Sequence, residues 1–564
     1  DDSKRVIKDI IKELELEEKS FPPREVQTII SRAKNDMQTP EDFAEQGKAI
    51  NDWRKIRMGK VYSLYNKKLR DANALDFDDL LWHTVRLLET AGDVREYYQR
   101  KFRYILIDEY QDTNALQYRL AALLTNQAKN ICVVGDDDQS IYRFRGADIT
   151  NILSFERQFR GARVIRLEQN YRSTQNILDA ANAVIRHNQG RKGKTLWTEN
   201  GRGELVTVKT TYNESDEANF VLGQIMMYYR RGGNWGDCAV LYRTNAQSNA
   251  MEYACKRNGV PYKIYGGLKF FDRAEVKDML AYLCVINNPT DDLRLRRIIN
   301  VPARKIGAAT VDKAQLIAAR YGLTLYDVLC RAEEFPELKS SAAKLKPFTD
   351  MIEEMRRRLP DCPLPEFYDY VCERSGYAPA LREKDDVESR GRLENVQELK
   401  SSILTYLENA EGTEPSLSGF LDEIALYTDL DSRADGDNCV TMMTMHAAKG
   451  LEFPQVFVVG MEEGLFPGNR AMGDGAEMEE ERRLCYVAMT RAREKLTLTN
   501  ARQRTLYGRT TPCMPSRFLN EIPEENMEWL SKPQPRSESW EERDSDYGDH
   551  GYGSYGGYGQ RSAA

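Results

Sequence analysis

Short apolar runs recur along the chain, and each ends in a cluster of polar residues. In KFRYILIDEYQD and NQAKNICVVGDDDQS the run stands directly before acids and amides. Runs of this length suit buried parallel strands, so the polar residues fall at the carboxyl ends of the strands, where open α/β sheets bind ligands. The segments VIRLEQNYRST, ELVTVKTTY, DCAVLYRTN and PQVFVVGMEEG predict further strands.

Two long stretches carry a helical pattern instead. Residues 1–72 are highly charged and are interrupted by Pro22-Pro23 and Pro40, which break helices. Between about Phe271 and Arg433 the strand signals are absent, and EVKDMLAYLCVI repeats its apolar residues with the helical period. The pattern therefore predicts α/β units interrupted by two mainly helical insertions.

The end of the chain has a different composition. From Ser531 it is rich in Pro, Ser and acids and then in Gly and Tyr, a mixture that cannot bury enough surface to fold. We expect a disordered tail that could contact nucleic acid weakly or bind a protein partner. Residues 551–556 match G-x-G-x-x-G, but no strand precedes them, so a flexible end is favoured over a dinucleotide site.

Composition narrows the class of protein. The 564 residues are 41% hydrophobic and 30% charged, and no apolar run approaches the roughly 18 residues of a membrane span. The first residues, DDSKRVIKDI, lack a signal-peptide core. The ten cysteines include no C-x-x-C pair, so we expect reduced thiols without a zinc site or disulfides. We expect a cytoplasmic protein that is neither secreted nor inserted in a membrane.

The net charge of −7 argues mildly against a nucleic-acid partner, but its distribution is uneven. Residues 521–550 contain ten Asp or Glu against three Lys or Arg, which leaves the rest of the chain nearly neutral. Residues 151–200 contain nine Lys or Arg against four Asp or Glu. A nearly neutral body with a basic strip still permits phosphate binding.

The first strand end whose side chains could bind a ligand or act in catalysis is the sequence DEYQD. The adjacent carboxylates of Asp108 and Glu109 repel each other and lose hydration at the end of a buried strand. A metal–phosphate site would explain them, because Asp can hold Mg²⁺ while Glu orients and deprotonates an attacking water. The alternative is a solvated strand end with an ordinary acidic turn.

The next strand ends in VGDDDQS and continues as IYRFRG. The amide of Gln139 could sense a phosphate, and the rings of Tyr142 and Phe144 interleave with Arg143 and Arg145. Single-stranded nucleic acid favours such an arrangement, since bases stack on rings while guanidinium groups meet phosphates. Core packing is the alternative for the two rings, but their spacing with arginines between them argues against full burial.

Five strings resemble, in order, the motifs of superfamily 1 DNA helicases of the PcrA/UvrD/Rep group: DEYQD, VGDDDQSIYRFRGA, QNYRS, TMHAAKGLEF and VAMTRAREKL. The resemblance covers about residues 1–520. It implies an α/β fold with two RecA-like parallel-sheet motor domains, the first incomplete, and two mainly helical inserted domains. We expect a helical insertion of the first motor domain over 1–72, the remainder of that domain over 73–165, the second motor domain over 166–270 and 434–520, its helical insertion over 271–433, and an acidic, then Gly/Tyr-rich disordered tail over 521–564.

The resemblance implies a site for ATP and Mg²⁺ between the motor domains. It assigns Mg²⁺ binding to Asp108, the role of catalytic base to Glu109, coupling of the γ-phosphate to the DNA side to Gln139, adenine stacking to Tyr171, a γ-phosphate contact to Arg172, a ribose contact to Glu452 and the arginine finger to Arg491.

The resemblance also implies contacts to single-stranded DNA and to duplex–single-strand junctions. It assigns base stacking to Phe77, Tyr142, Phe144 and Tyr507, backbone contacts to Arg145 and Arg243, and a DNA-side position to His446. Phe144 stands where relatives commonly have Trp, so stacking should survive with less area. The segment 303–307 resembles a duplex-binding loop but lacks its first Gly, which leaves duplex binding there open.

Arg491 has a second line of support. Leu484, Val487, Ala488 and Arg491 follow helical spacing, which predicts that Arg491 lies on a packed face. A buried arginine needs an anionic partner, so the alternative to a phosphate contact is a structural ion pair.

The family's nucleotide site begins with a P-loop, G-x-x-x-x-G-K-[ST], and the printed sequence contains none. The nearest string, Gly190-Arg-Lys-Gly-Lys-Thr195, has the wrong glycine spacing and follows a helical run, so we interpret it as a basic loop. We therefore expect a fragment of an ATP-dependent 3′-to-5′ DNA helicase and single-strand translocase of repair or replication. The alternative is a DNA-binding or interaction module that hydrolyses little ATP by itself.

Overall fold

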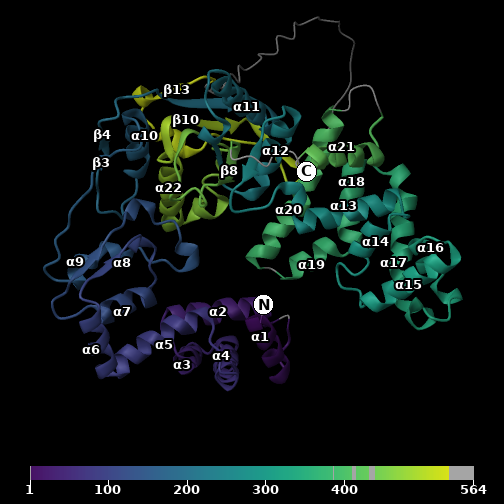
Figure 1. Cartoon of the computed structure of the whole chain (residues 1–564), viewed down its shortest axis with the longest axis horizontal. Helices are drawn as coiled ribbons and strands as arrows, with labels where there is room; N and C mark the ends of the chain where they lie inside the picture. Colours follow the sequence, from purple (N-terminus) through teal and green to yellow (C-terminus); the bar gives the residue numbers. More distant parts are fainter. Residues whose placement is uncertain (1, 19, 385, 410–413, 431–437, 532–564) are drawn as a thin grey trace, which may run out of the picture. The chain divides into compact units, whose positions relative to one another are not determined.

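A computed structural model describes residues 2–18, 20–384, 386–409, 414–430 and 438–531 (Figure 1). Its central element is a seven-stranded sheet in which every neighbouring pair is parallel, with the strand order β13-β5-β10-β9-β6-β8-β7. The strands are β5 (Val206–Thr211), β6 (Cys238–Tyr242), β7 (Tyr262–Ile264), β8 (Val440–Thr444), β9 (Phe453–Val458), β10 (Ala492–Ala501) and β13 (Met527–Trp529).

Alternation of side chains along these strands builds two cores, one on each face of the sheet. Ala239 and Leu241 of β6 pack on one face with α10 (Gln175–Ile185) and α22 (Gly475–Met489). Val240 of the same strand packs on the other face with α11 (Glu214–Arg230) and α12 (Ser248–Arg257). Figure 1 shows these helix pairs on opposite sides of the strands. All of β6 is buried, as an apolar run at the centre of a parallel sheet predicts.

A second, smaller parallel sheet pairs β1 (Ile105–Ile107) with β2 (Ile131–Val133). A small core covers it in part, while Leu106 remains 77% exposed. The polar clusters predicted at strand ends follow directly, as the 3-10 turns 110–112 and 137–139. The helices around it are α5 (Phe77–Thr90), α6 (Gly92–Lys101), α7 (Ala115–Leu124), α8 (Thr150–Leu153) and α9 (Phe155–Gln158).

The N-terminal helices form a unit with its own core. Ile7, Ile10, Val61 and Tyr62 are among the residues that fill it. The buried ammonium of Lys34 in α2 lies 2.7 Å from Oδ2 of Asp76, the N-cap residue of α5. The helices are α1 (Asp2–Glu13), α2 (Pro23–Asn35), α3 (Pro40–Ala49) and α4 (Trp53–Asp71).

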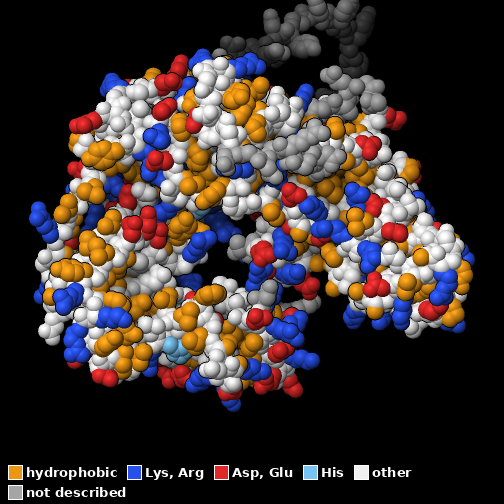
Figure 2. Space-filling view, in the orientation of Figure 1, with side chains coloured by type: hydrophobic (Ala, Val, Ile, Leu, Met, Phe, Trp, Pro, Cys, Tyr) orange, Lys and Arg blue, Asp and Glu red, His pale blue; other side chains and the backbone are white. Residues whose placement is uncertain are grey.

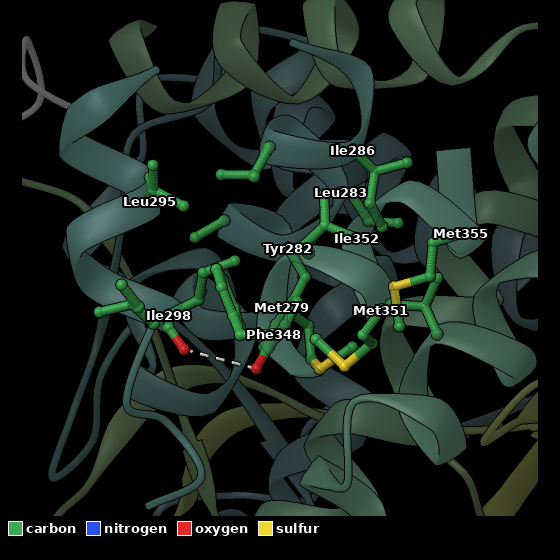
Figure 3. Close-up of a cluster of buried hydrophobic side chains, with 14 of the residues drawn as sticks. Met279, Tyr282, Leu283, Ile286, Leu295, Ile298, Phe348, Met351, Ile352 and Met355 are labelled. Atoms are coloured by element: carbon green, nitrogen blue, oxygen red, sulfur yellow. Dashed lines mark hydrogen bonds between the residues drawn. The ribbon is translucent and has the colours of Figure 1, made fainter. Parts of the chain in front are cut away.

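The largest apolar cluster lies in the second helical region. Met279, Tyr282, Phe348 and Met355 are at its centre, and the Tyr282 hydroxyl donates to the Ile298 carbonyl at 3.5 Å (Figure 3). Outside that core, Lys and Arg are interspersed with Asp and Glu over α14–α17 (Figure 2). The helices are α13 (Ala274–Asn287), α14 (Asp292–Ile298), α15 (Ala308–Tyr321), α16 (Leu325–Cys330), α17 (Lys339–Arg358), α18 (Leu364–Arg374), α19 (Tyr377–Lys384), α20 (Val387–Asn409) and α21 (Leu417–Leu430).

The structure confirms the predicted fold class and corrects two details. The run VIRLE forms no strand; only Gln169–Asn170 pair, as β3 with β4 (Trp197–Thr198), because Ile165 and Leu167 find no covering layer and stay exposed. The tail predicted from residue 521 begins too early, since β13 adds to the large sheet. Residues 532–564 of that predicted tail lie outside the described residues.

The remaining elements are the antiparallel hairpin of β11 (Gln503–Leu506) and β12 (Arg509–Pro512) and the short helix α23 (Arg517–Asn520). No helix among the described residues is long and apolar enough to cross a membrane.

A buried ion triad fixes the hairpin to the sheet and generates a prediction. Arg504 donates to Glu217 at 2.6 Å and to Glu462 at 2.8 Å, and all three side chains are at most 5% exposed. Arg504→Met should leave two buried carboxylates unpaired and lower the free energy of unfolding by about 3–5 kcal/mol, as measured by urea denaturation. Arg331→Met, which removes an exposed pair with Glu334, is the control and should change the unfolding midpoint little. Equal midpoints for the two variants would contradict the prediction.

Candidate functional site

Two carboxylates stand at the carboxyl end of β1, as the sequence predicts. Asp108 and Glu109 are both exposed, and the Glu109 backbone adopts a left-handed conformation with φ of 49°. The Glu109 N–H donates to Asp108 Oδ1 at 2.8 Å. Beneath them the fully buried Gln111 donates from Nε2 to Glu109 Oε2 at 2.5 Å. The position of the Glu109 carboxylate is therefore set by a buried amide.

The same amide joins this strand end to the next one. Gln111 Oε1 accepts the N–H of Asp136 at 2.9 Å, and Gln139 Nε2 donates to Asp136 Oδ2 at 2.8 Å. The approach requires a glycine before Asp136, because a Cβ on Gly135 would lie 2.5 Å from Gln111 Oε1. Glu109 and Gln139, predicted from separate motifs, thus belong to one hydrogen-bonded network.

Lys449 completes this network, although sequence reasoning did not single it out. Its ammonium, only 7% exposed, lies 2.6 Å from Asp112 Oδ2 and 3.3 Å from Glu109 Oε2, and it donates to the Gln139 carbonyl at 2.8 Å. It also lies over the Tyr142 ring, 5.2 Å from the centroid. The available signal was its position in the motif TMHAAKGLEF, between His446 and Glu452.

The predicted nucleotide contacts Tyr171, Arg172 and Glu452 lie together. Arg172 Nε donates to Glu452 Oε2 at 2.5 Å, and this contact lowers the pKa of the Glu452 carboxyl. The Tyr171 ring is 78% exposed, and its hydroxyl donates to Gln169 Oε1 at 3.1 Å. An exposed ring beside an arginine provides the surface that a purine base would stack on.

Arg491 is buried without an acidic partner. It follows α22 directly, is 2% exposed, and donates only to neutral oxygens: Val487 O at 2.9 Å, Leu451 O at 3.2 Å and Thr490 Oγ1 at 3.1 Å. Burial and the nearby Arg172 lower the pKa of Arg491 to about 10. Among the described residues no carboxylate forms an ion pair with it, so the structural ion pair that the sequence left open is not found. A buried guanidinium of this kind is suited to an anionic ligand.

The rings predicted to stack on DNA form a second group. Phe144 is 66% exposed and packs edge-on against His446, with ring centroids 5.6 Å apart. Arg145 lies over both Tyr142 and Phe144, at 5.2 and 5.4 Å from their centroids. The Tyr142 hydroxyl donates to the His446 carbonyl at 3.4 Å. The exposed Phe144 ring, with a guanidinium beside it, matches the pattern that binds single strands, whereas Tyr142 is half-buried against the core.

The other predicted DNA contacts are not part of this group. Phe77 is 90% exposed at the start of α5. Arg243 donates to Glu481 at 2.7 Å, so its charge is already paired. Tyr507 lies in the tight turn between β11 and β12, where burial and the carboxylates of Glu394 and Glu398 raise the pKa of its hydroxyl.

The carboxyl end of β1 fits Mg²⁺ in the way that phosphate-bound magnesium usually binds. No group of three or more His, Cys, Asp or Glu in the described ranges could hold a metal alone. One or two carboxylates together with phosphates and waters are sufficient for Mg²⁺, and Asp108 with Glu109 provides them.

Two family models match successive parts of this chain. Residues 1–160 match the family model described as UvrD/REP helicase N-terminal domain, and residues 165–503 match UvrD-like helicase C-terminal domain. The ATP-dependent DNA helicase PcrA of Staphylococcus epidermidis is 48% identical over 526 residues, which are 93% of this chain and 72% of that protein. The protein of the same name from Staphylococcus aureus is 47% identical over 529 residues, with the same shares.

His446 generates a prediction about pH. Burial, with the charges of Arg243 and Arg145, lowers its pKa from 6.5 to about 4. Folded protein therefore keeps this imidazole neutral where unfolded chain is protonated, so its contribution to stability is complete above pH 6.5 and lost as the pH falls toward 4. In histidine-labelled NMR spectra, the His446 signal, assigned by His446→Gln, should not titrate between pH 8 and about 5.5. A midpoint near 6.5 would contradict this, and Arg145→Gln should move the midpoint upward.

Proposed function

Because this chain belongs to the UvrD-like helicase family, we propose that it is an ATP-dependent 3′-to-5′ DNA helicase and single-stranded DNA translocase of repair or replication. The chain would move along a single strand and separate duplexes at junctions. The observation that carries the proposal is Arg491, a buried guanidinium that no described carboxylate neutralises. Phosphoryl transfer needs charge neutralisation more than covalent help, and Arg491 would supply it.

On the nucleotide side each residue has a distinct task. Asp108 is the carboxylate that would hold Mg²⁺, which supplies neutralisation of phosphate charge when bound. Glu109 orients and deprotonates the attacking water, and the Gln111 amide keeps its carboxylate in place. Arg172 would exchange its contact with Glu452 for the γ-phosphate, which leaves Glu452 for the ribose. Tyr171 would stack on adenine.

The coupling between nucleotide and DNA follows the contacts of Lys449. Its ammonium binds Asp112 and the Gln139 carbonyl, and it lies against Tyr142. Tyr142 in turn reaches the backbone of His446 and the exposed Phe144 ring. A change at the γ-phosphate that moves Gln139 would thus move the rings on which bases stack.

A second candidate is a DNA-binding module without ATPase activity. It is favoured by one observation: the printed sequence contains no G-x-x-x-x-G-K-[ST] string. The DNA-side rings do not depend on that motif. Binding of single-stranded DNA without turnover would be the signature of this module.

The experiment that tests the proposal measures unwinding of duplexes with a 3′ or a 5′ single-stranded tail. The protein is this chain preceded by the P-loop segment of a family member, with ATP and Mg²⁺ present. We expect unwinding of the 3′-tailed duplex only.

Glu109→Gln in the same protein should keep nucleotide binding but lose about 10²–10⁴-fold in hydrolysis, because the general base is removed. Unwinding of 5′-tailed duplexes, or an unchanged turnover in the variant, would contradict these roles. The same assay on the 564 residues alone distinguishes the second candidate.

Phe144 allows a test of DNA binding without ATP. Because the ring is 66% exposed, Phe144→Ala should weaken single-stranded DNA binding by about 1–3 kcal/mol, equally for different base sequences, with an unchanged melting temperature. Phe144→Trp should match or tighten binding, since the larger ring adds overlap. Fluorescence anisotropy and thermal unfolding measure the two quantities. A lowered melting temperature with unchanged affinity would instead make Phe144 a packing residue.

A further inference from the structure

The basic string that resembles an incomplete P-loop has a definite position in the fold. Residues 188–194, the basic segment, follow α10 in the region that matches the C-terminal family domain. They contact the turn 136–139, the acidic turn, which follows β2 in the region that matches the N-terminal family domain. The two regions of the chain therefore meet through charged groups at this place.

Each of three consecutive aspartates accepts a group from the basic segment. Arg191 binds Asp138 through two parallel hydrogen bonds, Nε to Oδ1 at 2.8 Å and Nη2 to Oδ2 at 2.6 Å. The Lys192 N–H donates to Asp137 Oδ2 at 2.7 Å, and the Lys194 ammonium binds Asp136 Oδ1. Two-point arginine pairing fixes orientation as well as distance.

The pair of Arg191 and Asp138 is buried. Asp138 is 1% exposed and the Arg191 side chain 13%. Burial raises the pKa of the Asp138 carboxyl although Arg191 acts in the opposite direction, and the contact with Asp138 raises the pKa of Arg191. An ion pair in such surroundings persists only when its geometry is held, and removal of one partner leaves an uncompensated buried charge.

A phosphate-binding loop would look different. It presents free backbone N–H groups and a free lysine to its ligand. Here the Lys192 N–H is donated to Asp137, and the charges of Arg191 and Lys194 are paired with carboxylates. The string is therefore not a substitute P-loop.

At its other end the basic segment is fastened to α22. Asn188 Nδ2 donates to the Glu479 carbonyl at 2.9 Å, and the Gln189 N–H donates to Glu479 Oε1 at 2.8 Å. Arg482 donates to Asn188 Oδ1 at 2.8 Å. Since α22 ends at Met489, two residues before Arg491, the segment joins the helix that leads to Arg491 with the acidic turn.

The acidic turn transmits this contact toward the catalytic carboxylate. Asp136, bound by Lys194, also accepts the Gln139 amide, and its own N–H donates to Gln111, which holds Glu109. The geometry points to Arg191 and Lys194 as positioning residues that hold Gln139 and Glu109 in register with Arg491 across the two family domains. This inference rests on the proposed function, because it concerns the same nucleotide site.

The test compares Arg191→Gln with the wild-type full chain and with Lys192→Gln. The control removes a neighbouring charge whose side chain pairs with Glu156 outside the acidic turn. Hydrogen exchange read by mass spectrometry should show faster exchange in Arg191→Gln over residues 107–112 and 134–140, and no change in the control. Loosening confined to residues 186–196 would overturn the inference, because it would show a merely local role.

A functional measurement, made on the chain preceded by the P-loop segment of a family member, complements hydrogen exchange. Stimulation of ATP hydrolysis by single-stranded DNA should fall about 10–100-fold in Arg191→Gln, while affinity for single-stranded DNA without ATP stays within about twofold, because displaced catalytic groups lose rate rather than DNA contacts. Asp138→Asn should behave alike, and the double variant should lose no more than either single one. Additive losses, or full stimulation in Arg191→Gln, would overturn the inference. If wild-type protein shows no DNA-stimulated hydrolysis, the proposed function fails, and the hydrogen-exchange result alone decides the positioning role.

Discussion

The arrangement of the site depends on the contacts of the buried Lys449 ammonium. It is held by two carboxylates of the strand end after β1 and by a carbonyl of the turn after β2, although it comes from the loop between β8 and β9. A charge that is 7% exposed is stable only with such partners. The requirement therefore draws loops of both family domains together, and it places Glu109, Gln139 and Tyr142 around one point.

The parts of the fold that depend on local pattern could be predicted from the sequence. The apolar runs of β1, β2, β5, β6 and β9 predict strands because each is a continuous apolar stretch of strand length, although only β6 is buried along its whole length. The run VIRLE carries the same signal but forms no strand, because strand formation also requires a neighbour, and Val164, Ile165 and Leu167 have none among the described residues. The apolar pattern indicates which secondary structure a segment can form, while the presence of a neighbouring strand determines whether a strand forms.

The candidate site shows the same division. Glu109, Gln139 and Arg491 could be named from motifs, although their roles remain proposals. Lys449 lies in the same motif as His446 and Glu452, but the string alone does not give its contacts, which form only when tertiary structure buries its ammonium. The string 190–195 resembles a P-loop only locally, and its partners are aspartates far earlier in the chain, which no local pattern connects to it.

Buried cations in this structure fall into two kinds: those paired with carboxylates, which stabilise the fold, and those that contact only neutral oxygens. Arg191, Lys449 and Arg504 are each matched by carboxylates, so their charges are neutralised within the protein and their effect is to fix loops and strands. Arg491 is as buried as Arg504 but contacts only neutral oxygens. These hydrogen bonds offset only part of its desolvation cost, and a polyphosphate would offset more of it on binding. Arg491 is thus a strongly desolvated positive charge that, under the proposed function, would meet an anion beside the residues that the matched cations hold in place.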